Sequence, residues 1–302
     1  MNEKFMRVLI TGANGQLGYA LQKTAAAFSA KTDFALQLIA LTRAEFDLAQ
    51  SETLTALLNQ YRPDAIINAA AYTAVDKAEA DQVQANKINA LAVAVIARWC
   101  EANQAPLIQV STDFVFDGKK SSPYLPEDQT NPLGIYGQTK CAGEQAALEN
   151  CSTGYVVRTG WVYCEQGNNF VKTMLRLGAE REVLGVVADQ IGTPTYAVNL
   201  AQMIWQLLEQ RPKQKLFHFS DAGVASWYDF AAAIFAEAKR VGLIEKMPQV
   251  NPIATSDYPT PAQRPAYSVL DKRQTWSLLG IAPCHWRDAL SEMLDAYKNQ
   301  RT

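Results

Sequence analysis

Histidine is nearly absent from the sequence, which has only His218 and His285 among its 302 residues. A histidine-rich metal site is therefore excluded, and a hydrolase built on a Ser-His-Asp triad is disfavoured. His218 lies in the apolar run 216–219, where we expect it to be a buried strand residue. The chemistry of this chain must come from other side chains.

Cysteine is also scarce, with 5 residues and no CxxC spacing, so neither a disulfide framework nor a cysteine zinc site is expected. Free thiols in a reducing compartment fit this odd number better. No segment approaches the roughly 20 apolar residues of a membrane span, and the N-terminus lacks the long apolar stretch of a signal peptide. A net charge of -2 predicts no nucleic-acid or anionic-membrane partner. We therefore expect a cytoplasmic protein with neither partner.

The first half of the chain alternates short β-branched runs with longer amphipathic stretches. Strands are expected at residues 7–11, 36–42, 64–68, 106–111 and 155–158, and helices at residues 16–28, 51–61, 81–103 and 136–149. Ser51 is expected to cap the second of these helices. Continuous apolar strands separated by helices indicate a parallel sheet covered on both faces. The fold class is therefore α/β, with a doubly wound parallel sheet of the Rossmann type.

The pattern loosens after about residue 160. Helices are expected at residues 170–180, 197–210, 227–241 and 286–297, and the proline-rich stretch 258–265 is expected to be an ordered loop. We predict a dinucleotide-binding domain over residues 1–160. Residues 161–302 are then mainly a smaller substrate-binding lobe, with some segments returning to the sheet. The cleft between them would lie beyond the carboxyl ends of the strands, where open α/β sheets bind ligands.

A glycine-rich turn, residues 12–18, follows the first predicted strand and opens the first predicted helix. Gly12, Gly15 and Gly18 allow a tight turn, a close approach of backbone N–H groups to a pyrophosphate, and close packing of helix against strand. The positive end of the helix then faces the phosphates. This context favours a dinucleotide site over an ordinary turn.

The end of the second strand bears on the choice of cofactor. It reads Thr42-Arg43, with no acid before Glu45 and Asp47. An acid there binds the ribose hydroxyl of NAD, whereas an arginine accommodates the phosphate of NADP. Arg43 therefore favours NADPH, although NADH and a merely solvated arginine stay open. The run 69–71 after the third strand is all alanine, which either lets a cofactor lie close or simply packs against a helix.

The central evidence is a pair of elements that place a hydroxyl, a phenol and an amine together. Thr112 ends the fourth strand, and Tyr136 and Lys140 lie four apart on the next helix, on one face. A nearby ammonium is expected to lower the pKa of the tyrosine and make it a usable proton donor. Thr112 is suited to polarise a carbonyl. A second pair of this spacing, Tyr19 and Lys23, follows no such strand and is interpreted as a surface pair.

These motifs together resemble the extended short-chain dehydrogenase/reductase family, and within it the dTDP-4-dehydrorhamnose reductases. The resemblance covers nearly the whole chain and rests on the runs 12–18, 68–79, 111–116, 132–140, 158–163, 167–175, 189–195 and 258–265. It implies NAD(P)H-dependent reduction of the 4-keto group of dTDP-4-dehydro-L-rhamnose to dTDP-L-rhamnose, for polysaccharide synthesis. Tyr136 would protonate O4, and Thr112 and Lys140 would complete the triad.

The resemblance and the motifs together define two sets of binding residues. The cofactor set is Gly12, Asn14, Gly15, Gln16, Leu17, Thr42, Arg43, Asp47, Leu48, Ala69, Ala70, Ala71, Tyr72, Thr73, Tyr136 and Lys140. The substrate set is Thr112, Asp113, Trp161, Asn169 and Arg264. Trp161 corresponds to a family tryptophan beside the deoxysugar, with a plain core tryptophan as the alternative. Asn169 and Arg264 are expected at the nucleotide and pyrophosphate, unless their roles are structural.

The sequence also departs from the family pattern. Some members form a dimer bridged by magnesium through glutamates, but the matching positions here are Ala20 and Val198. Neither side chain ligates a cation, so no metal is expected, while a homodimer stays open. Two other functions stay open: a non-catalytic NADP-binding regulatory subunit, and another nucleotide-sugar epimerase, dehydratase or reductase. A dehydratase usually has a glutamate after Asp113, where this chain has Phe114.

Overall fold

A six-stranded parallel sheet forms the centre of the molecule in the computed structural model, which describes residues 5–300. The strand order is β10-β5-β4-β3-β1-β2. The strands are β1 (Phe5–Thr11), β2 (Ala35–Leu41), β3 (Ala65–Asn68), β4 (Leu107–Thr112), β5 (Gly154–Thr159) and β10 (Leu216–His218). Strand β2 pairs with one edge of β1 and strand β3 pairs with the other edge. The direction in which the chain adds strands therefore reverses between β1 and β3. Such a switch point is where doubly wound sheets bind ligands.

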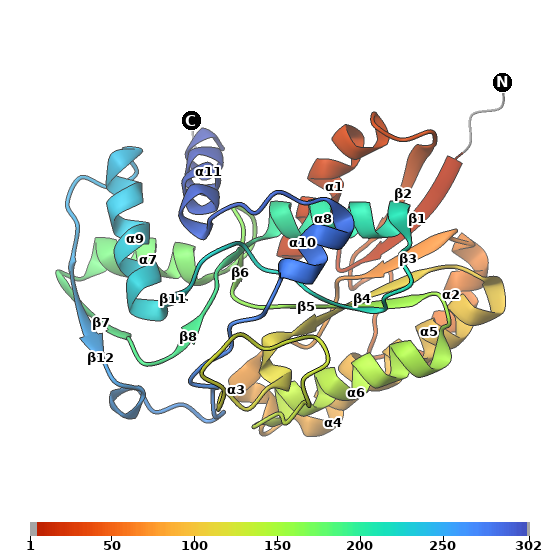
Figure 1. The fold of residues 1–302 in the computed structure, drawn as a ribbon, viewed down its shortest axis with the longest axis horizontal. Helices are drawn as coiled ribbons and strands as arrows, with labels where there is room; N and C mark the ends of the chain where they lie inside the picture. Colours follow the sequence, from red (N-terminus) through yellow and green to blue (C-terminus); the bar gives the residue numbers. More distant parts are fainter. Residues whose placement is uncertain (1–4, 301–302) are drawn as a thin grey trace.

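Helices cover both faces of this sheet, as the unbroken apolar strands predicted. On one face lie α1 (Gln16–Ser29) and α8 (Ala197–Gln210), and on the other lie α2 (Ser51–Tyr61), α5 (Ala92–Asn103) and α6 (Ile135–Asn150) (Figure 1). Successive strand residues point to opposite faces, so Val8 and Ile10 pack in one hydrophobic cluster and Leu9 packs in the other. The predicted α/β doubly wound sheet is confirmed.

Two details of the expected helices were wrong. Ser51 does not cap α2, because the helix begins at Ser51 and the capping position is Gln50, which makes no side-chain cap. The long helix expected over residues 81–103 is divided into α4 (Gln82–Asn86), a π-helical turn (Lys87–Leu91) and α5. The wider turn leaves the buried Asn89 side chain bonded outside its own helix, to the backbone of Tyr72 and to Thr139. Turns of this kind occur often beside functional sites.

The rest of the second half forms a smaller lobe. Its helices are α7 (Phe170–Glu180), α9 (Trp227–Arg240) and α11 (Trp286–Asn299), whereas α10 (Arg273–Leu279) packs against α8 and β10, where Thr275 donates to the carbonyl of His218. Its short strands pair as β6 (Val162–Tyr163) with β9 (Thr195–Tyr196), β7 (Val183–Val187) with β12 (Gln249–Ile253), and β8 (Ile191–Gly192) with β11 (Ala225–Ser226). Residues 258–265 form neither helix nor strand, which confirms the expected loop. No helix within residues 5–300 has both the length and the apolar character needed to cross a bilayer.

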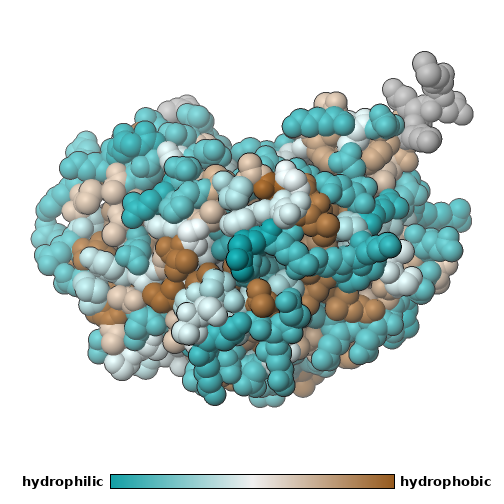
Figure 2. Space-filling model, in the orientation of Figure 1, coloured by the Kyte–Doolittle hydropathy of each residue, from teal (hydrophilic) through white to brown (hydrophobic). Residues whose placement is uncertain are grey.

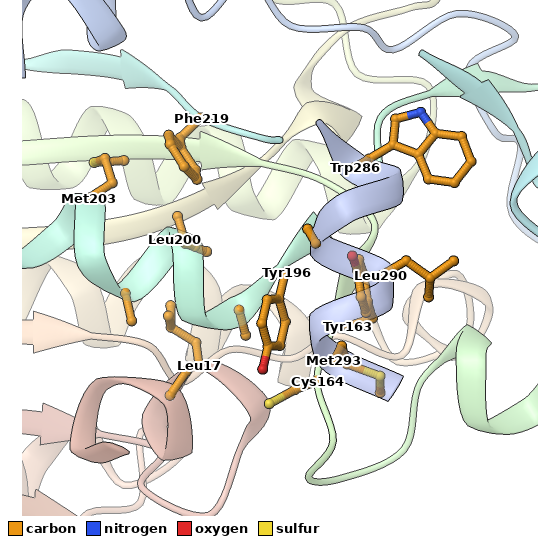
Figure 3. Packing of buried hydrophobic residues seen from close by; sticks show 14 of the residues in the cluster. Leu17, Tyr163, Cys164, Tyr196, Leu200, Met203, Phe219, Trp286, Leu290 and Met293 are labelled. Atoms are coloured by element: carbon orange, nitrogen blue, oxygen red, sulfur yellow. The ribbon is translucent and has the colours of Figure 1, made fainter. Parts of the chain in front are cut away.

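One hydrophobic cluster runs from the sheet into the smaller lobe. It joins Leu17 of α1 and Leu200 of α8 to Trp286 and Leu290 of α11. Figure 3 shows Tyr163, Cys164 and Tyr196 gathered beside α11, between these two groups. The face of the molecule in Figure 2 is mostly hydrophilic, with hydrophobic residues in small scattered patches. The two lobes are therefore held together by a shared core.

Helix α6 is fixed to strand β5 by a buried ion pair. The Arg158 guanidinium donates to both carboxylate oxygens of Glu144, at 2.7–3.1 Å, and both side chains are about nineteen-twentieths buried. Arg158 also donates to the carbonyl of Pro126 (3.1 Å) and to Nε2 of His218 (3.3 Å). Burial, with the charge of Arg158, lowers the pKa of His218 to about 3, so this imidazole is neutral and accepts from the arginine.

We predict that Glu144→Gln lowers the free energy of unfolding by roughly 3 kcal/mol, because it leaves a buried guanidinium without its counter-charge. Urea denaturation measures the loss. The control is Glu180→Gln, since Glu180 pairs with Arg176 on the exposed surface of α7. That control should cost less than about 0.5 kcal/mol. Equal losses in the two variants would contradict the assigned role of the buried pair.

Candidate active site

The glycine-rich turn forms a close-packed cradle between β1 and α1. Gly12 has φ +68°, and a Cβ atom there would lie 3.1 Å from the backbone of Ala70 after β3. A Cβ on Gly18 would lie 2.2 Å from the carbonyl oxygen of Gly12, so only glycine fits. Helix α1 begins at Gln16 with no side-chain cap at Gly15 and no acid in its first turn. Its first N–H groups and its positive dipole end are therefore available to an anion.

A cavity of about 650 Å³ lies at the carboxyl ends of the central strands and contains this cradle. All of the predicted cofactor residues except Thr42 and Tyr72 line it. Thr42 is turned toward Glu45, to which its hydroxyl donates at 2.8 Å, and the hydroxyl of Tyr72 donates to Asp81 at 3.2 Å. Arg43 lies at the cavity rim with its side chain 76% exposed, 3.5 Å from Asp47.

The same cavity contains a buried hydroxyl without a partner. Ser111 is 4% exposed, and its Oγ finds no hydrogen-bond partner among the described residues. Buried polar groups are nearly always paired, so this hydroxyl is available to a polar group that binds beside it. The glycine cradle, the alanine wall and this hydroxyl fit a dinucleotide that extends from the α1 terminus to the end of β4.

The three predicted reactive residues lie together at the other end of the cavity. Thr112, Tyr136 and Lys140 all line it. Helix α6 lies close to the end of β4 because residue 137 is glycine, where a Cβ would be 2.2 Å from the carbonyl of Phe114. This approach brings the Tyr136 phenol into hydrogen-bond contact with the side chain of Thr112. Lys140 donates through Nζ to the carbonyl of Val110 at 2.6 Å.

The protonation states of this group differ in one respect from expectation. Burial raises the pKa of Tyr136 to about 12, against the lowering effect of the Thr112 hydrogen bond. The predicted lowering by Lys140 was wrong, because burial of the phenol dominates and the Lys140 ammonium is turned toward Val110. Burial lowers the pKa of Lys140 to about 8, and the charge of Glu144 one turn away works against this. Tyr136 is therefore protonated at neutral pH, as a proton donor must be.

Of the predicted substrate residues, Asp113 and Trp161 line the cavity beside Thr112. Burial raises the pKa of Asp113 to about 6, against hydrogen bonds from Ser268 and Thr112. A Cβ on Gly160 would lie 2.7 Å from the Asp113 carboxylate, so the strand that leads to Trp161 passes directly over this acid. The threonine, the acid and the tryptophan thus surround one end of the site.

The structure does not bring Asn169 and Arg264 to the cavity wall. Asn169 caps helix α7 and donates to Gln16 at 3.0 Å, which ties the smaller lobe to the glycine-rich turn. Arg264 forms a two-pronged ion pair with Asp76, at 2.8 and 3.1 Å, and donates to the carbonyl of Ala262. Both side chains are thus bonded to groups of the protein itself.

The surface interpretation of the second Tyr–Lys pair was wrong in part. Lys23 forms an ion pair with Glu165, whose side chain is fully buried, and Glu165 accepts from the hydroxyl of Tyr196 at 3.1 Å. Neither Tyr19 nor Lys23 lines the cavity. Ala20 and Val198 pack in and against the hydrophobic cluster between α1 and α8. Within residues 5–300 no group of three or more acidic, histidine or cysteine side chains is arranged to hold a metal ion.

Several wall residues were not singled out from the sequence. Some lie within motifs that were noted, and their neighbours there were the available signal: Val75, Ser111, Phe114, Thr159, Gly160, Val162, Gly167 and Asn168. Others are apolar side chains outside those motifs: Phe46, Ile88, Val110 and Leu200. These apolar residues exclude water from the middle of the site.

Comparison with known proteins gives matches over almost the whole chain. A family model described as RmlD substrate binding domain matches residues 6–299. A dTDP-4-dehydrorhamnose reductase of Aggregatibacter actinomycetemcomitans is 41% identical over 292 residues, covering 95% of this chain and 98% of that protein. The crystal structure of a dTDP-4-dehydrorhamnose reductase of Clostridium acetobutylicum is 38% identical with a TM-score of 0.88, covering 97% and 100%. That of the Bacillus anthracis dTDP-4-dehydrorhamnose reductase in complex with NADP is 36% identical with a TM-score of 0.87, covering 96% and 99%. The resemblance inferred from the motifs is thereby confirmed.

We predict that Ser111→Ala stabilises the ligand-free protein by about 1 kcal/mol, because it removes a buried hydroxyl that has no partner. The same change should weaken binding of a nicotinamide dinucleotide by about tenfold, since the dinucleotide then loses its hydrogen bond to this hydroxyl. Thermal unfolding and calorimetric titration measure the two effects.

The control is Ser226→Ala, because the Ser226 hydroxyl caps α9 by accepting from the N–H of Asp229 at 3.0 Å. Loss of that cap should destabilise the protein by about 1 kcal/mol and leave dinucleotide binding unchanged. If Ser111→Ala destabilised the ligand-free protein as Ser226→Ala does, Ser111 would have a partner within the protein.

Proposed function

The chain belongs to the RmlD substrate binding domain family, and from this premise and the geometry of the cavity we propose that it is an NADPH-dependent reductase of a nucleotide-linked keto sugar. The substrate we propose is dTDP-4-dehydro-L-rhamnose and the product is dTDP-L-rhamnose, a precursor for polysaccharide synthesis made in the cytoplasm. The observation that carries the proposal is the single cavity that joins the glycine cradle to Thr112, Tyr136 and Lys140.

NADPH supplies a hydride to the carbonyl carbon when it is bound. The residues proposed to hold it are those that line the cradle and the alanine wall. Arg43 at the rim is placed to pair with a ribose phosphate, which an exposed arginine binds through two N–H groups. Lys140, whose Nζ lies at the carbonyl of Val110 on the cavity wall, is placed to bond the nicotinamide ribose.

Tyr136 is the proposed proton donor to the sugar O4. Its pKa of about 12 keeps the phenol protonated until charge develops on the carbonyl oxygen. Thr112 donates a second hydrogen bond to the same oxygen, in place of its 3.1 Å bond to Asp113. Asp113, freed from Thr112, accepts a hydrogen bond from a sugar hydroxyl.

The dehydratase alternative is less well supported. Phe114 occupies the position of the second acid and packs edge-on against Tyr136, with ring centroids 5.6 Å apart. An apolar ring beside the phenol excludes water and offers no base for removal of a carbon-bound proton. A regulatory protein would have no need of the buried Tyr136 and Lys140, whose desolvation costs stability.

We predict that Tyr136→Phe lowers turnover of dTDP-4-dehydro-L-rhamnose by at least about 100-fold, because the proton donor is lost. NADPH affinity should stay within about twofold, since the ring is retained. The loss of NADPH absorbance measures turnover, and calorimetric titration measures affinity. Tyr19→Phe is the matched control at the same spacing from a lysine, and it should keep near-full turnover. Near-full turnover by Tyr136→Phe would remove Tyr136 from the role of donor.

We also predict that kcat/KM depends on pH through the ionisation of Lys140 in the free enzyme. The pKa of Lys140 lies at about 8, so its ammonium is present below that pH and is lost above it. The kcat/KM for the sugar nucleotide should therefore fall as the pH rises from about 7 to about 9. Lys140→Arg keeps its charge over this range, so its lower activity should not show the fall. A wild-type profile that stays flat over the same range would contradict this assignment.

A further inference from the structure

Trp161 has a strained backbone in the middle of the site. Its φ is +51°, in the left-handed region that bulky side chains rarely adopt. The residue comes two positions after β5, and its carbonyl accepts from the N–H of Thr195 at 3.1 Å, which holds the turn. Strain of this kind costs of order 1–3 kcal/mol and persists only where the surroundings enforce it. Contacts of Trp161 with its surroundings must therefore enforce this conformation.

The indole of Trp227 provides this support from behind. The two rings are stacked with centroids 3.5 Å apart and planes inclined by 4°. The edge of the Trp161 ring lies against Gly192, where a Cβ would be 2.6 Å from Cε2. Phe170 packs on Trp227 in turn, with centroids 4.7 Å apart. The ring of Trp161 is thus supported on one face and along one edge.

Trp227 is itself fixed by the start of helix α9. Ser226 and Asp229 form a capping box, in which Asp229 accepts from the N–H of Ser226 at 2.9 Å and its own N–H donates back to the serine at 3.0 Å. The preceding strand β11 pairs with β8, so that Ala225 lies opposite Gly192. The capping box and the strand pair together fix the position of Trp227, the first residue of α9.

Trp161 lines the cavity, whereas Trp227 does not. Gly160, which precedes Trp161, lies over the Asp113 carboxylate at the reacting end of the site. The C–H groups of a deoxysugar ring and its methyl group form an apolar face that packs well on an aromatic ring. A ring that is stacked from behind offers this face in one orientation only.

We propose that Trp227 is a positioning residue, which holds the strained Trp161 indole against the sugar ring of the substrate and so sets the affinity for the sugar end. This inference rests on the proposed function for the identity of the sugar. The support of Trp161 by Trp227 does not depend on the proposed function, because the two rings are stacked within the protein itself.

The kinetic test compares four single variants. Trp227→Ala should raise KM for dTDP-4-dehydro-L-rhamnose by at least about tenfold and leave the Kd for NADPH within about twofold, and Trp227→Phe should restore most of the affinity. Trp161→Ala should match Trp227→Ala, and the double variant should be no worse than Trp161→Ala. Phe28→Ala is the control, because it removes the ring stacked on Trp205, a tryptophan outside the cavity. Additive losses, or a loss in kcat alone, would overturn the proposal.

A second measurement needs no turnover. The ¹⁹F NMR spectrum of protein labelled with 5-fluorotryptophan has a Trp161 signal, which is assigned by its disappearance in Trp161→Phe. That signal should shift and broaden in Trp227→Ala and stay in place in Phe28→Ala. An unchanged Trp161 signal in Trp227→Ala would overturn the proposal whatever the substrate is. If the signal moves as expected but the wild type does not reduce the keto sugar, the proposed function fails and the positioning role stands.

Discussion

The close approach of helix α6 to the end of strand β4 is the contact on which the site depends. Gly137 makes it possible, since a Cβ there would lie 2.2 Å from the carbonyl oxygen of Phe114. Gly143 lets the same helix approach the π-helical turn, where a Cβ would lie 2.0 Å from the carbonyl oxygen of Asn89. The Glu144–Arg158 ion pair then fixes the helix from the other side. Because of this contact the phenol of Tyr136 reaches Thr112. A helix displaced by the width of one methyl group would separate the donor from the strand that holds the substrate oxygen.

Burial determines the chemistry of the groups brought together there. It raises the pKa of Tyr136 and lowers that of Lys140, so the phenol stays protonated while the ammonium is easily lost. A reduction needs a proton to be delivered after charge appears on oxygen, and a phenol of high pKa gives up its proton only then. The apolar side chains of the cavity wall keep water away and so strengthen each of these interactions. The same burial makes the Glu144 charge, one turn beyond Lys140, important for keeping the lysine charged.

Much of the fold and of the site was predictable from the sequence, because both depend on local patterns. The apolar strands, the glycines after β1 and the Tyr136–Lys140 spacing each act within one element or one turn, and the structure brings their cavity residues together. Contacts between distant elements were not predictable: the Arg264–Asp76 pair, the Asn169 bond to Gln16 and the Trp161–Trp227 stack join residues far apart in the chain. The direction of the Tyr136 pKa shift was missed for the same reason, because spacing shows that a lysine is near but not how deeply the phenol is buried.

The reaction proposed for this chain is the transfer of hydride from NADPH to the C4 carbon of a dTDP-linked keto sugar. The most direct test is to supply dTDP-4-dehydro-L-rhamnose with NADPH that carries deuterium at the transferable position, and to locate the label in the product by NMR. We expect deuterium at C4 of dTDP-L-rhamnose, with one label for each NADPH oxidised. A product without label, or label that stays on the cofactor while the sugar is epimerised or dehydrated, would contradict it.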